Sequence, residues 1–294
     1  MRTIEYIIPE EYGERKLYSF LKGSAKLSSK LIRTLKRIPD GMLLNGEHVR
    51  TIDIVHFGDK LSVNIPEDEN AADACELMPD VIYEDEDLLI VNKPAMLPIH
   101  ESHNHRGDTL ANSVSGYLLK KGKRCTFRAI GRLDKGTSGL VVCALNSHVA
   151  SRLSGEIKKE YLAIATGKYE GSGTVDAPIY RPDPMKTYRV VDEKGDRAVT
   201  HWEAVAGNEE LTLLKIHLET GRTHQIRVHF ANLGTPLLGD KMYGTEDERI
   251  CHQALHCAKL TLVHPITGKE IICKAPMPEE MDAVANMLET FKTP

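Results

Sequence analysis

The spacing of hydrophobic residues divides the chain into segments of helical and of extended pattern. In residues 17–37 apolar side chains recur every three or four positions, which predicts helix. Gly23 interrupts this pattern and Ser28 or Ser29 is placed to cap a new helix, so we expect two short helices joined by a turn. Four basic residues recur at the same spacing and are expected on one helical face: Lys26, Lys30, Arg33 and Arg37.

Extended segments and a polar stretch follow these helices. Asn45-Gly46 separates two short apolar runs, which predicts a β-hairpin, and Gly58-Asp59 is a turn before a further strand at 60–65. The next residues are polar and acidic, with a proline at each end. We therefore predict a small unit at 14–66, a linker at 67–79 and a larger unit at 80–294.

The larger unit mixes both kinds of segment. Helices are predicted at 109–121, 147–158 and 278–291, and strands at 87–92, 161–166, 198–206, 211–218, 255–263 and 270–274. Two strand pairs are separated only by the turns Asn208-Glu209 and Thr267-Gly268, as in antiparallel hairpins. The predicted class is α+β, with a mixed but mainly antiparallel sheet.

Composition places the chain among ordinary globular proteins. It has 294 residues, 41% of them hydrophobic, and 38 basic against 42 acidic residues, a formal net charge of −4. No apolar run has membrane-spanning length, and the first residues carry acids where a signal or transit peptide would not. The six cysteines are scattered and form no C-x-x-C pair. We expect a cytoplasmic chain with reduced thiols and no membrane association.

The charge is unevenly distributed. Residues 15–37 contain eight basic side chains and no acid, and residues 120–135 contain seven basic side chains and one acid. Residues 66–87 contain ten acids and no base. Clustered positive charge suits the phosphates of a nucleic acid, but it also occurs on solvated helix faces. Two such clusters leave both interpretations open.

One candidate for chemistry is the stretch GRLDKGTSGL at 131–140. Asp134 lies in a predicted turn between Arg132 and Lys135, where cations and turn amides keep a carboxylate ionised. An ionised carboxylate can act as a nucleophile or a base. On this stretch alone, an Asx turn in which Asp134 accepts hydrogen bonds from nearby amides is the preferred interpretation.

A second candidate is the stretch GRTHQIRVH at 221–229. It combines two arginines, two histidines and a glutamine: Arg222, His224, Gln225, Arg227 and His229. Helical spacing would bring Arg222 and Gln225 within one turn. Arginines beside histidines suit phosphate or carboxylate recognition, although the start of a surface helix would show the same residues.

Together these stretches resemble a known family. In order along the chain, IVNKPAMLPIH, GRLDKGTSGL, KKEYLA, GRTHQIRVH and LLGDKMYG resemble the motifs of the RluA-type pseudouridine synthases over residues 80–278. The two N-terminal helices followed by LLNGEHV and FGDKLSV resemble the S4 RNA-binding domain over residues 14–66. The resemblance implies the pseudouridine synthase fold and an S4-like unit that presents Lys26, Lys30, Arg33 and Arg37 to RNA.

The resemblance also implies an activity and its catalytic residues. The family isomerises uridine to pseudouridine within RNA and formally needs no metal, cofactor or redox change. Asp134 matches the essential carboxylate, which either attacks C1′ or removes the C2′ proton. Arg222 matches the arginine that pairs with this aspartate, and Tyr161 matches the tyrosine that lies against the target base.

Further residues are implied to contact the substrate. Arg132 looks like the arginine that fills the gap left by a flipped uridine, Ile226 is expected to form an apolar wall under the base, and Gln225 is expected among the RNA-binding residues. The basic residues of 120–128 are expected to hold flanking phosphates. Gly131 departs from the family, whose members often carry histidine at this position, and it can change how the loop meets the displaced RNA.

The expected partner is a structured RNA, ribosomal RNA rather than transfer RNA, and the expected oligomeric state is a monomer. A non-catalytic RNA-binding or assembly factor built on the same fold is the main alternative. The letters DKGT also suggest an aspartyl-phosphate enzyme. This chain has neither the membrane helices nor the second acid that such enzymes carry, so this alternative is disfavoured. A zinc site among the histidines and cysteines is disfavoured because the Cys-His pairs are adjacent residues.

Overall fold

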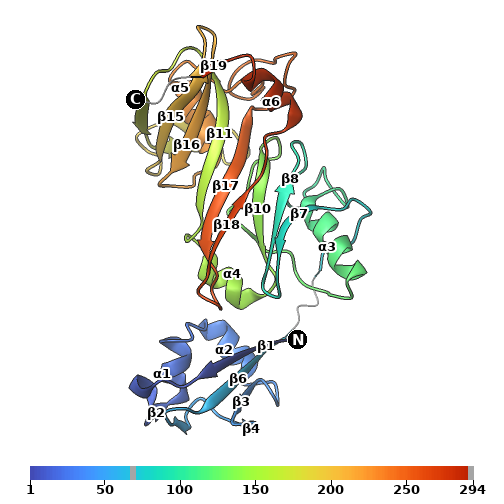
Figure 1. Ribbon diagram of the computed structural model, residues 1–294, viewed down its shortest axis with the longest axis vertical. Helices are drawn as coiled ribbons and strands as arrows, with labels where there is room; N and C mark the ends of the chain where they lie inside the picture. The colour runs from blue at the N-terminus through green and yellow to red at the C-terminus, as the bar shows by residue number, and fades with distance from the viewer. Residues whose placement is uncertain (67–70, 291–294) are drawn as a thin grey trace.

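The computed structural model describes residues 1–66 and 71–290, and it places them around two sheets that each have their own hydrophobic core (Figure 1). We refer to residues 1–66 as the N-terminal unit and to residues 71–290 as the larger unit. Among these residues no helix is both long and apolar enough to cross a membrane.

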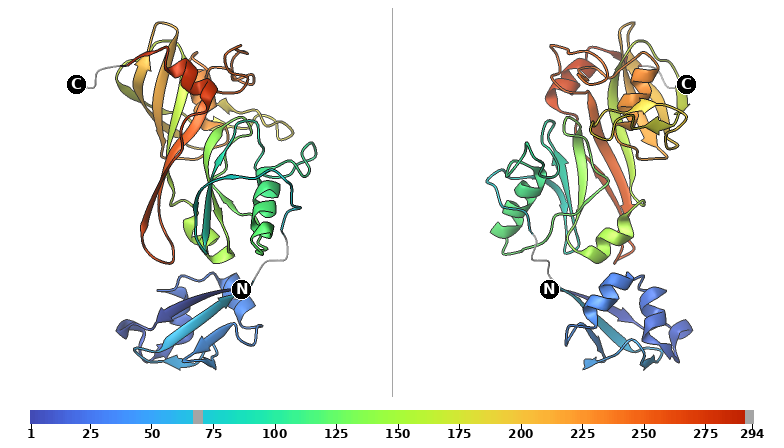
Figure 2. Two further views of the ribbon diagram at one scale, coloured as in Figure 1. Left: turned by 45° about the vertical axis from the view of Figure 1, so that its right-hand side comes forward. Right: turned by 180° about the vertical axis from the view of Figure 1, so that it is seen from behind.

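The N-terminal unit is a four-stranded antiparallel sheet covered by two helices (Figure 2). The sheet order is β1 (Arg2–Ile7), β6 (Lys60–Ile65), β3 (Met42–Leu44) and β4 (Glu47–His48), and a small ribbon joins β2 (Arg15–Lys16) to β5 (Ile54–Val55). Helices α1 (Leu17–Lys22) and α2 (Ser29–Leu35) bury their apolar faces against this sheet, and a 3-10 turn, η1 (Glu10–Tyr12), precedes them.

Two predictions for this unit can be compared with the structure. The pair of short helices is confirmed, and Ser28 caps α2 by accepting a hydrogen bond from the Leu31 amide. The boundary at residue 14 is wrong, because β1 pairs with β6 along its whole length and completes the sheet.

The larger unit is built on an eleven-stranded mixed sheet. Its main path runs β12 (Ser172–Asp176), β15 (Val199–Gly207), β16 (Leu211–Leu218), β11 (Lys158–Thr166), β17 (Leu255–Val263), β10 (Ser138–Ala144), β8 (Leu88–Lys93) and β7 (Asp80–Glu84). Three short strands join from the side: β9 (Ala129–Ile130) on β10, β18 (Glu270–Lys274) on β17 and β19 (Glu289–Thr290) on β15. β10 and β17 are parallel and the other paired strands are antiparallel, so the predicted class is confirmed.

Four helices and a small ribbon complete this unit: α3 (Leu110–Lys120), α4 (Ser147–Leu153), α5 (Gln225–Asn232), α6 (Glu279–Ala285), and β13 (Ile179–Tyr180) paired with β14 (Val190–Val191). Two predicted helices are too long. The helix at 147–158 ends early because Lys158 already pairs in β11. The helix at 278–291 ends at Ala285, after which Glu289 pairs with Gly207, and residue 291 lies outside the described residues.

Part of the stretch predicted as a linker packs against the larger unit. The carbonyls of Ala72 and Asp73 accept hydrogen bonds from Ser115 Oγ at 2.6 Å and Asn112 Nδ2 at 2.8 Å. The carbonyl oxygen of Cys75 approaches so closely that a Cβ at Gly116 would lie 2.3 Å from it. Residues 72–75 therefore pack along α3 instead of spanning free between the units; residues 67–70 lie outside the described part.

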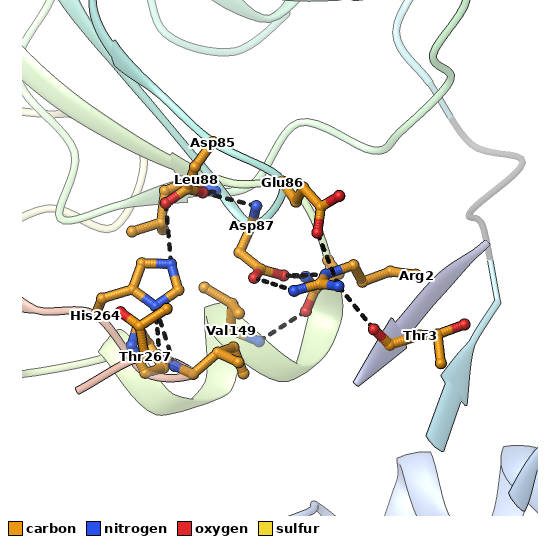
Figure 3. A network of polar contacts seen from close by, with 12 residues as sticks. Arg2, Thr3, Asp85, Glu86, Asp87, Leu88, Val149, His264 and Thr267 are labelled. Atoms are coloured by element: carbon orange, nitrogen blue, oxygen red, sulfur yellow. Dashed lines mark hydrogen bonds and ion pairs between the residues drawn. The ribbon is translucent and has the colours of Figure 1, made fainter. Parts of the chain in front are cut away.

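The two units meet at an ion pair between β1 and the turn before β8 (Figure 3). Arg2 donates from Nε and one terminal nitrogen to the two oxygens of Asp87, at 3.0 and 2.9 Å, and its other terminal nitrogen lies 2.9 Å from Glu86. Ile266, at the tip of the β17–β18 hairpin, packs against the cores of both units. We call this contact the Arg2 junction.

Candidate active site

Asp134 lies in the turn that leads into β10. The turn is closed by a hydrogen bond from the Thr137 amide to the Asp134 carbonyl at 3.1 Å, and Gly136 leaves room for Gln253, whose Oε1 would lie 2.3 Å from a Cβ there. The Asp134 side chain is 26% exposed. The preferred interpretation from this stretch alone, an Asx turn, does not describe the carboxylate, which faces Arg227.

A buried lysine donates hydrogen bonds to the backbone of this turn and of the stretch after β8. Lys93, the last residue of β8, donates from Nζ to the carbonyls of Pro94, Leu97 and Lys135 at 2.9, 2.9 and 3.0 Å. Burial lowers the pKa of Lys93 to about 7, although the negative charge of Asp134 opposes this shift. Lys93 thus ties the NKP stretch to the backbone beside Asp134.

Arg227 is the basic partner of Asp134. Its terminal nitrogen Nη1 donates to Asp134 Oδ2 at 3.0 Å, and its Nε and Nη2 donate to the two oxygens of Asp240 at 2.7 and 2.8 Å. Burial opposes the charge of Arg227, but the hydrogen bonds and charge of Asp240 and Asp134 outweigh it and raise the pKa of Arg227. The guanidinium is therefore a fixed charge, and the planar two-pronged contact with Asp240 sets its direction.

The predicted pairing of Arg222 with Asp134 is wrong. Arg222 lies 3.2 Å from Asp196 and donates from Nε to the Arg197 carbonyl at 3.1 Å. The reason is local: His224 adopts a left-handed backbone with φ of 58°, so α5 begins only at Gln225 and the preceding arginine turns away. Sequence spacing cannot show such a turn.

Gln225 lies at the pocket but its amide is used within the protein. Oε1 accepts from the Arg222 amide and Thr220 Oγ1, both at 2.9 Å, and Nε2 donates to the Val199 carbonyl at 2.9 Å and to Thr200 Oγ1 at 3.1 Å. With all these groups engaged, its predicted place among the RNA-contacting residues is not supported; it fixes the start of α5 against β15.

The remaining predicted residues of the larger unit line one pocket with Asp134. Tyr161 from β11 and Ile226 from α5 are buried walls, and Arg132 and Arg222 stand at the exposed rim. Burial, assisted by the nearby Cys257 and Asp134, raises the pKa of Tyr161 well above its ordinary value. Tyr161 is therefore a neutral phenol at neutral pH, and its ring is available for stacking.

Two residues that contact the lining of this pocket, Asp240 and Tyr243, were missed from the sequence, and His224 was named only as a member of its stretch, without a role. Asp240 orients Arg227, as described. His224 Nε2 lies 3.8 Å from Asp134 Oδ2, and its Nδ1 lies 2.8 Å from the hydroxyl of Tyr243. The ring of Tyr243 in turn lies 5.0 Å from the Arg227 guanidinium carbon. Only their position in the fold, not their spacing, connects them to Asp134.

A second groove adjoins the pocket through Arg222. It has a volume of about 430 Å³, and its cationic side chains come from the segment around β13 and β14 and from the turn before α5: Arg181, Arg189, Lys194 and Arg222. Asp196 also lines it and pairs with Arg222. The groove extends positive charge from Asp134 outward over the surface.

The four basic residues predicted to contact RNA in the N-terminal unit are exposed, but only two of them lie on a helix. Lys30 and Arg33 are on α2, whereas Lys26 precedes it with a φ of 50° and Arg37 follows its end at Leu35. The predicted single helical face is therefore shorter than expected. The four side chains still belong to one short segment around α2.

One group of potential metal ligands exists among residues 1–66 and 71–290: Asp85, Asp87 and His264 at the Arg2 junction. His264 Nδ1 accepts hydrogen bonds from the Ile266 and Thr267 amides, both at 3.1 Å, so a neutral ring carries its proton on Nε2 and offers no lone pair there. Nε2 lies 3.1 Å from Asp85 Oδ2 without the alignment of a hydrogen bond, and Arg2 occupies Asp87. These contacts favour an ion-pair network over a metal site.

In this pocket a buried arginine connects the partly exposed Asp134 to a second acid, and exposed arginines stand at the rim. Such an arrangement suits the binding of an anionic substrate. The chain belongs to the RNA pseudouridylate synthase family, whose model matches residues 87–232. It is therefore an RNA pseudouridine synthase, as the sequence motifs predicted.

Relatives support this assignment over nearly the whole chain. An uncharacterized RNA pseudouridine synthase of Bacillus subtilis, YhcT, is 37% identical over 99% of this chain and 98% of its own length. The ribosomal large subunit pseudouridine synthase D of Escherichia coli is 36% identical over 76% of this chain and 75% of its own length. The solved structure of human RNA pseudouridylate synthase domain containing 1 matches the fold with a TM-score of 0.59, at 24% identity, over 72% of this chain and 89% of its own.

Proposed function

We propose that this enzyme converts uridine to pseudouridine in a structured ribosomal RNA, with Asp134 as the catalytic carboxylate. The observation that supports the role of Asp134 best is its ion pair with the buried Arg227, in the same pocket as Tyr161, Ile226 and Arg132. The hydrogen bond from Arg227 Nη1 fixes the direction of the carboxylate, as a nucleophile or base requires.

The isomerisation is balanced without an external reactant. The N1–C1′ bond of uridine breaks, the uracil rotates, and C5 bonds to C1′; the proton on C5 leaves and N1 gains one. Asp134 acts either by attack on C1′ or by removal of the C2′ proton, and both routes need the same ionised carboxylate beside the ribose. Tyr161 and Ile226 supply the apolar walls between which a uracil can turn.

Access to the ribose requires the nucleotide to leave its helix. Extrusion costs a few kcal/mol, which contacts with the protein must offset. Arg132, exposed at the rim two residues before Asp134, is placed to occupy the vacated position. The cationic groove from Arg222 to Arg181 is placed to hold the phosphates on one side of the extruded nucleotide.

A ribosomal substrate is favoured over transfer RNA by two features. Relatives named for the large ribosomal subunit, from Haemophilus influenzae and Escherichia coli, are 32% and 36% identical to the chain. The N-terminal unit, which we assign to the S4-like RNA-binding domains, holds an exposed basic segment around α2 that suits a large folded RNA. The proposed setting is the cytoplasm, with the chain acting as a monomer.

The Asp134→Asn variant tests this function. The amide keeps the size of the side chain and a hydrogen-bond acceptor for Arg227, but it cannot act as nucleophile or base at neutral pH. We expect release of tritium from RNA containing 5-tritiated uridine to fall by at least roughly 10²–10⁴-fold, with RNA affinity within a few-fold of wild type. Asp282→Asn, on α6, is the matched control and should react normally.

Two results would contradict the proposal. Normal tritium release by Asp134→Asn would remove Asp134 from catalysis. A wild-type protein that binds ribosomal RNA tightly but releases no tritium from any RNA would favour the non-catalytic assembly factor instead. The substrate is tested separately, by mapping pseudouridines in ribosomal and transfer RNA from cells with and without this gene.

A further inference from the structure

His224 lies beside the catalytic carboxylate without a role in the chemistry described above. Its side chain is 10% exposed and lines the same pocket as Asp134. The left-handed backbone at this residue, with φ of 58°, turns the ring so that Nε2 faces Asp134 Oδ2 at 3.8 Å while Nδ1 faces the Tyr243 hydroxyl at 2.8 Å. A non-glycine residue in this conformation costs roughly 1–3 kcal/mol, so the surrounding contacts must hold the backbone of His224 in place.

The contacts of Tyr243 favour one of the two neutral tautomers of His224. The Tyr243 hydroxyl accepts a hydrogen bond from the Arg189 amide at 2.9 Å. Its own proton is then directed to the other polar neighbour, Nδ1 of His224. Since Nδ1 accepts, a neutral imidazole must carry its proton on Nε2, and this N–H points toward Asp134.

Burial favours the neutral forms of both His224 and Tyr243. It lowers the pKa of His224, because desolvation outweighs the attraction of Asp134, and it raises the pKa of Tyr243 to about 12. At neutral pH the imidazole is therefore uncharged and the phenol keeps its proton. The charged groups that act on His224 are Asp134, Arg227, Arg189 and Asp240.

The ring of Tyr243 is held rigidly at the centre of this arrangement. It stacks on Tyr188, with ring centres 5.0 Å apart and 24° between the planes, and the Arg227 guanidinium carbon lies 5.0 Å from its centre. The Tyr243 amide also lies 3.3 Å from Asp240 Oδ1, the same carboxylate that orients Arg227. One motif, GDKMYG, thus fixes both neighbours of Asp134.

Both neighbours face the same oxygen of Asp134, but only Arg227 lies within hydrogen-bond distance of it. Arg227 Nη1 donates to Oδ2 at 3.0 Å, and His224 Nε2 approaches Oδ2 at 3.8 Å. We propose that Tyr243 and His224 form a positioning relay in which Tyr243 fixes the Nε2–H tautomer of His224, so that His224 and Arg227 together hold Oδ2 and leave Oδ1 to react with the ribose. This inference deepens the proposed function and rests on it for the identity of the reaction.

The tautomer is tested directly, without any RNA. Nitrogen NMR of ¹⁵N-histidine-labelled protein reports which ring nitrogen is protonated, and His224→Gln identifies the signal. We expect the wild-type protein at pH 7 to show His224 neutral with its proton on Nε2. In Tyr243→Phe the Nδ1–H form should become populated and the pKa of His224 should rise, because loss of the hydroxyl removes a donor that stabilises the neutral ring.

The consequence for catalysis is tested by single-turnover kinetics. Tyr243→Phe keeps the ring that stacks on Tyr188 and contacts Arg227, so we expect RNA affinity within two-fold of wild type but a chemical step slowed about ten-fold, the loss of one hydrogen bond of about 1.4 kcal/mol. His224→Gln, which retains an N–H donor, should be faster than His224→Leu. Tyr117→Phe removes a hydroxyl bonded to Glu84 outside the pocket and is the control.

The results distinguish failure of the relay from failure of the proposed function. A wild-type His224 that is charged or carries its proton on Nδ1 overturns the relay, whatever the enzyme modifies. Equal rates for Tyr243→Phe and wild type, or equal rates for His224→Gln and His224→Leu, also overturn it. Failure of the proposed function would appear differently, as an inactive wild-type enzyme with the expected tautomer.

Discussion

At the scale of single residues, the pocket shows why two arginines five positions apart cannot be exchanged. Arg227 is 7% exposed and enclosed between Asp134 and Asp240, whereas Arg222 is at the rim and pairs with the exposed Asp196. A buried charge is tolerated only when its partners are in place, while an exposed pair contributes little. Replacing Arg227 should therefore affect turnover and stability, whereas replacing Arg222 should mainly affect RNA binding.

Arg227→Gln should be severely impaired in turnover, because Asp134 loses the charge that orients it and Asp240 remains buried without a cation. The free energy of unfolding should also fall, by roughly 3–5 kcal/mol. Arg222→Gln should keep the single-turnover rate at saturating RNA within a few-fold and mainly weaken RNA binding. Urea unfolding and single-turnover kinetics on both variants measure this difference. An inactive Arg222→Gln together with a wild-type-like Arg227→Gln would instead support the pairing of Arg222 with Asp134 that the sequence predicted.

At the scale of elements, hydrophobic periodicity and turn residues were sufficient to predict most of the strands in the larger sheet. The strand predicted at 211–218 has those bounds in β16, and the turns at Asn208-Glu209 and Thr267-Gly268 join antiparallel neighbours as expected. Shorter or competing elements were missed, such as β1, whose pairing with β6 spans more than fifty residues. The pocket of Asp134 is lined by Arg132, Tyr161, Arg222 and Ile226, whose catalytic and substrate roles stay predictions. Which arginine pairs with Asp134 depends on where α5 starts and on Asp240, which local pattern does not reveal.

The segment around α2 gives an element-scale prediction. Lys30 and Arg33 are exposed on this helix and are proposed to contact RNA phosphates. Replacing both with alanine should weaken binding to structured RNA at low salt and make the slope of log affinity against log salt shallower by about 0.7–0.9 per lost phosphate contact. The rate of the bound complex should not change.

Lys168→Ala combined with Lys274→Ala removes two exposed charges of the larger unit, one from the loop after β11 and one from the end of β18, and is the matched control. Filter binding over a series of salt concentrations distinguishes the pairs. Identical salt slopes for both double variants would mean that α2 does not contact the RNA.

At the scale of the whole molecule, the Arg2 junction is the polar contact that positions the RNA-binding candidate relative to the pocket (Figure 3). Asp87 is only 3% exposed and accepts hydrogen bonds from Arg2 and from Asn146 Nδ2 at 2.8 Å, whereas Glu86 is 74% exposed. The bond to Asp87 is also the main reason why the pKa of Arg2 is raised. Because charge-assisted pairs in protected positions contribute more than exposed ones, the link between the units depends on Asp87.

Arg2→Gln should therefore loosen the N-terminal unit from the larger unit while leaving each core intact. We expect a larger radius of gyration in small-angle X-ray scattering and a decrease of roughly 1.5–3 kcal/mol in the free energy that couples the units, from the loss of a hydrogen-bonded charge. Single-turnover rates on a short RNA hairpin that reaches only the pocket should stay at the wild-type level, and affinity for a long RNA that spans both units should fall. Glu86→Gln, which removes only the exposed contact, should change the coupling by less than about 1 kcal/mol. If Arg2→Gln scattered like wild type and bound the long RNA equally well, the packing of Ile266 alone would be enough to hold the units together.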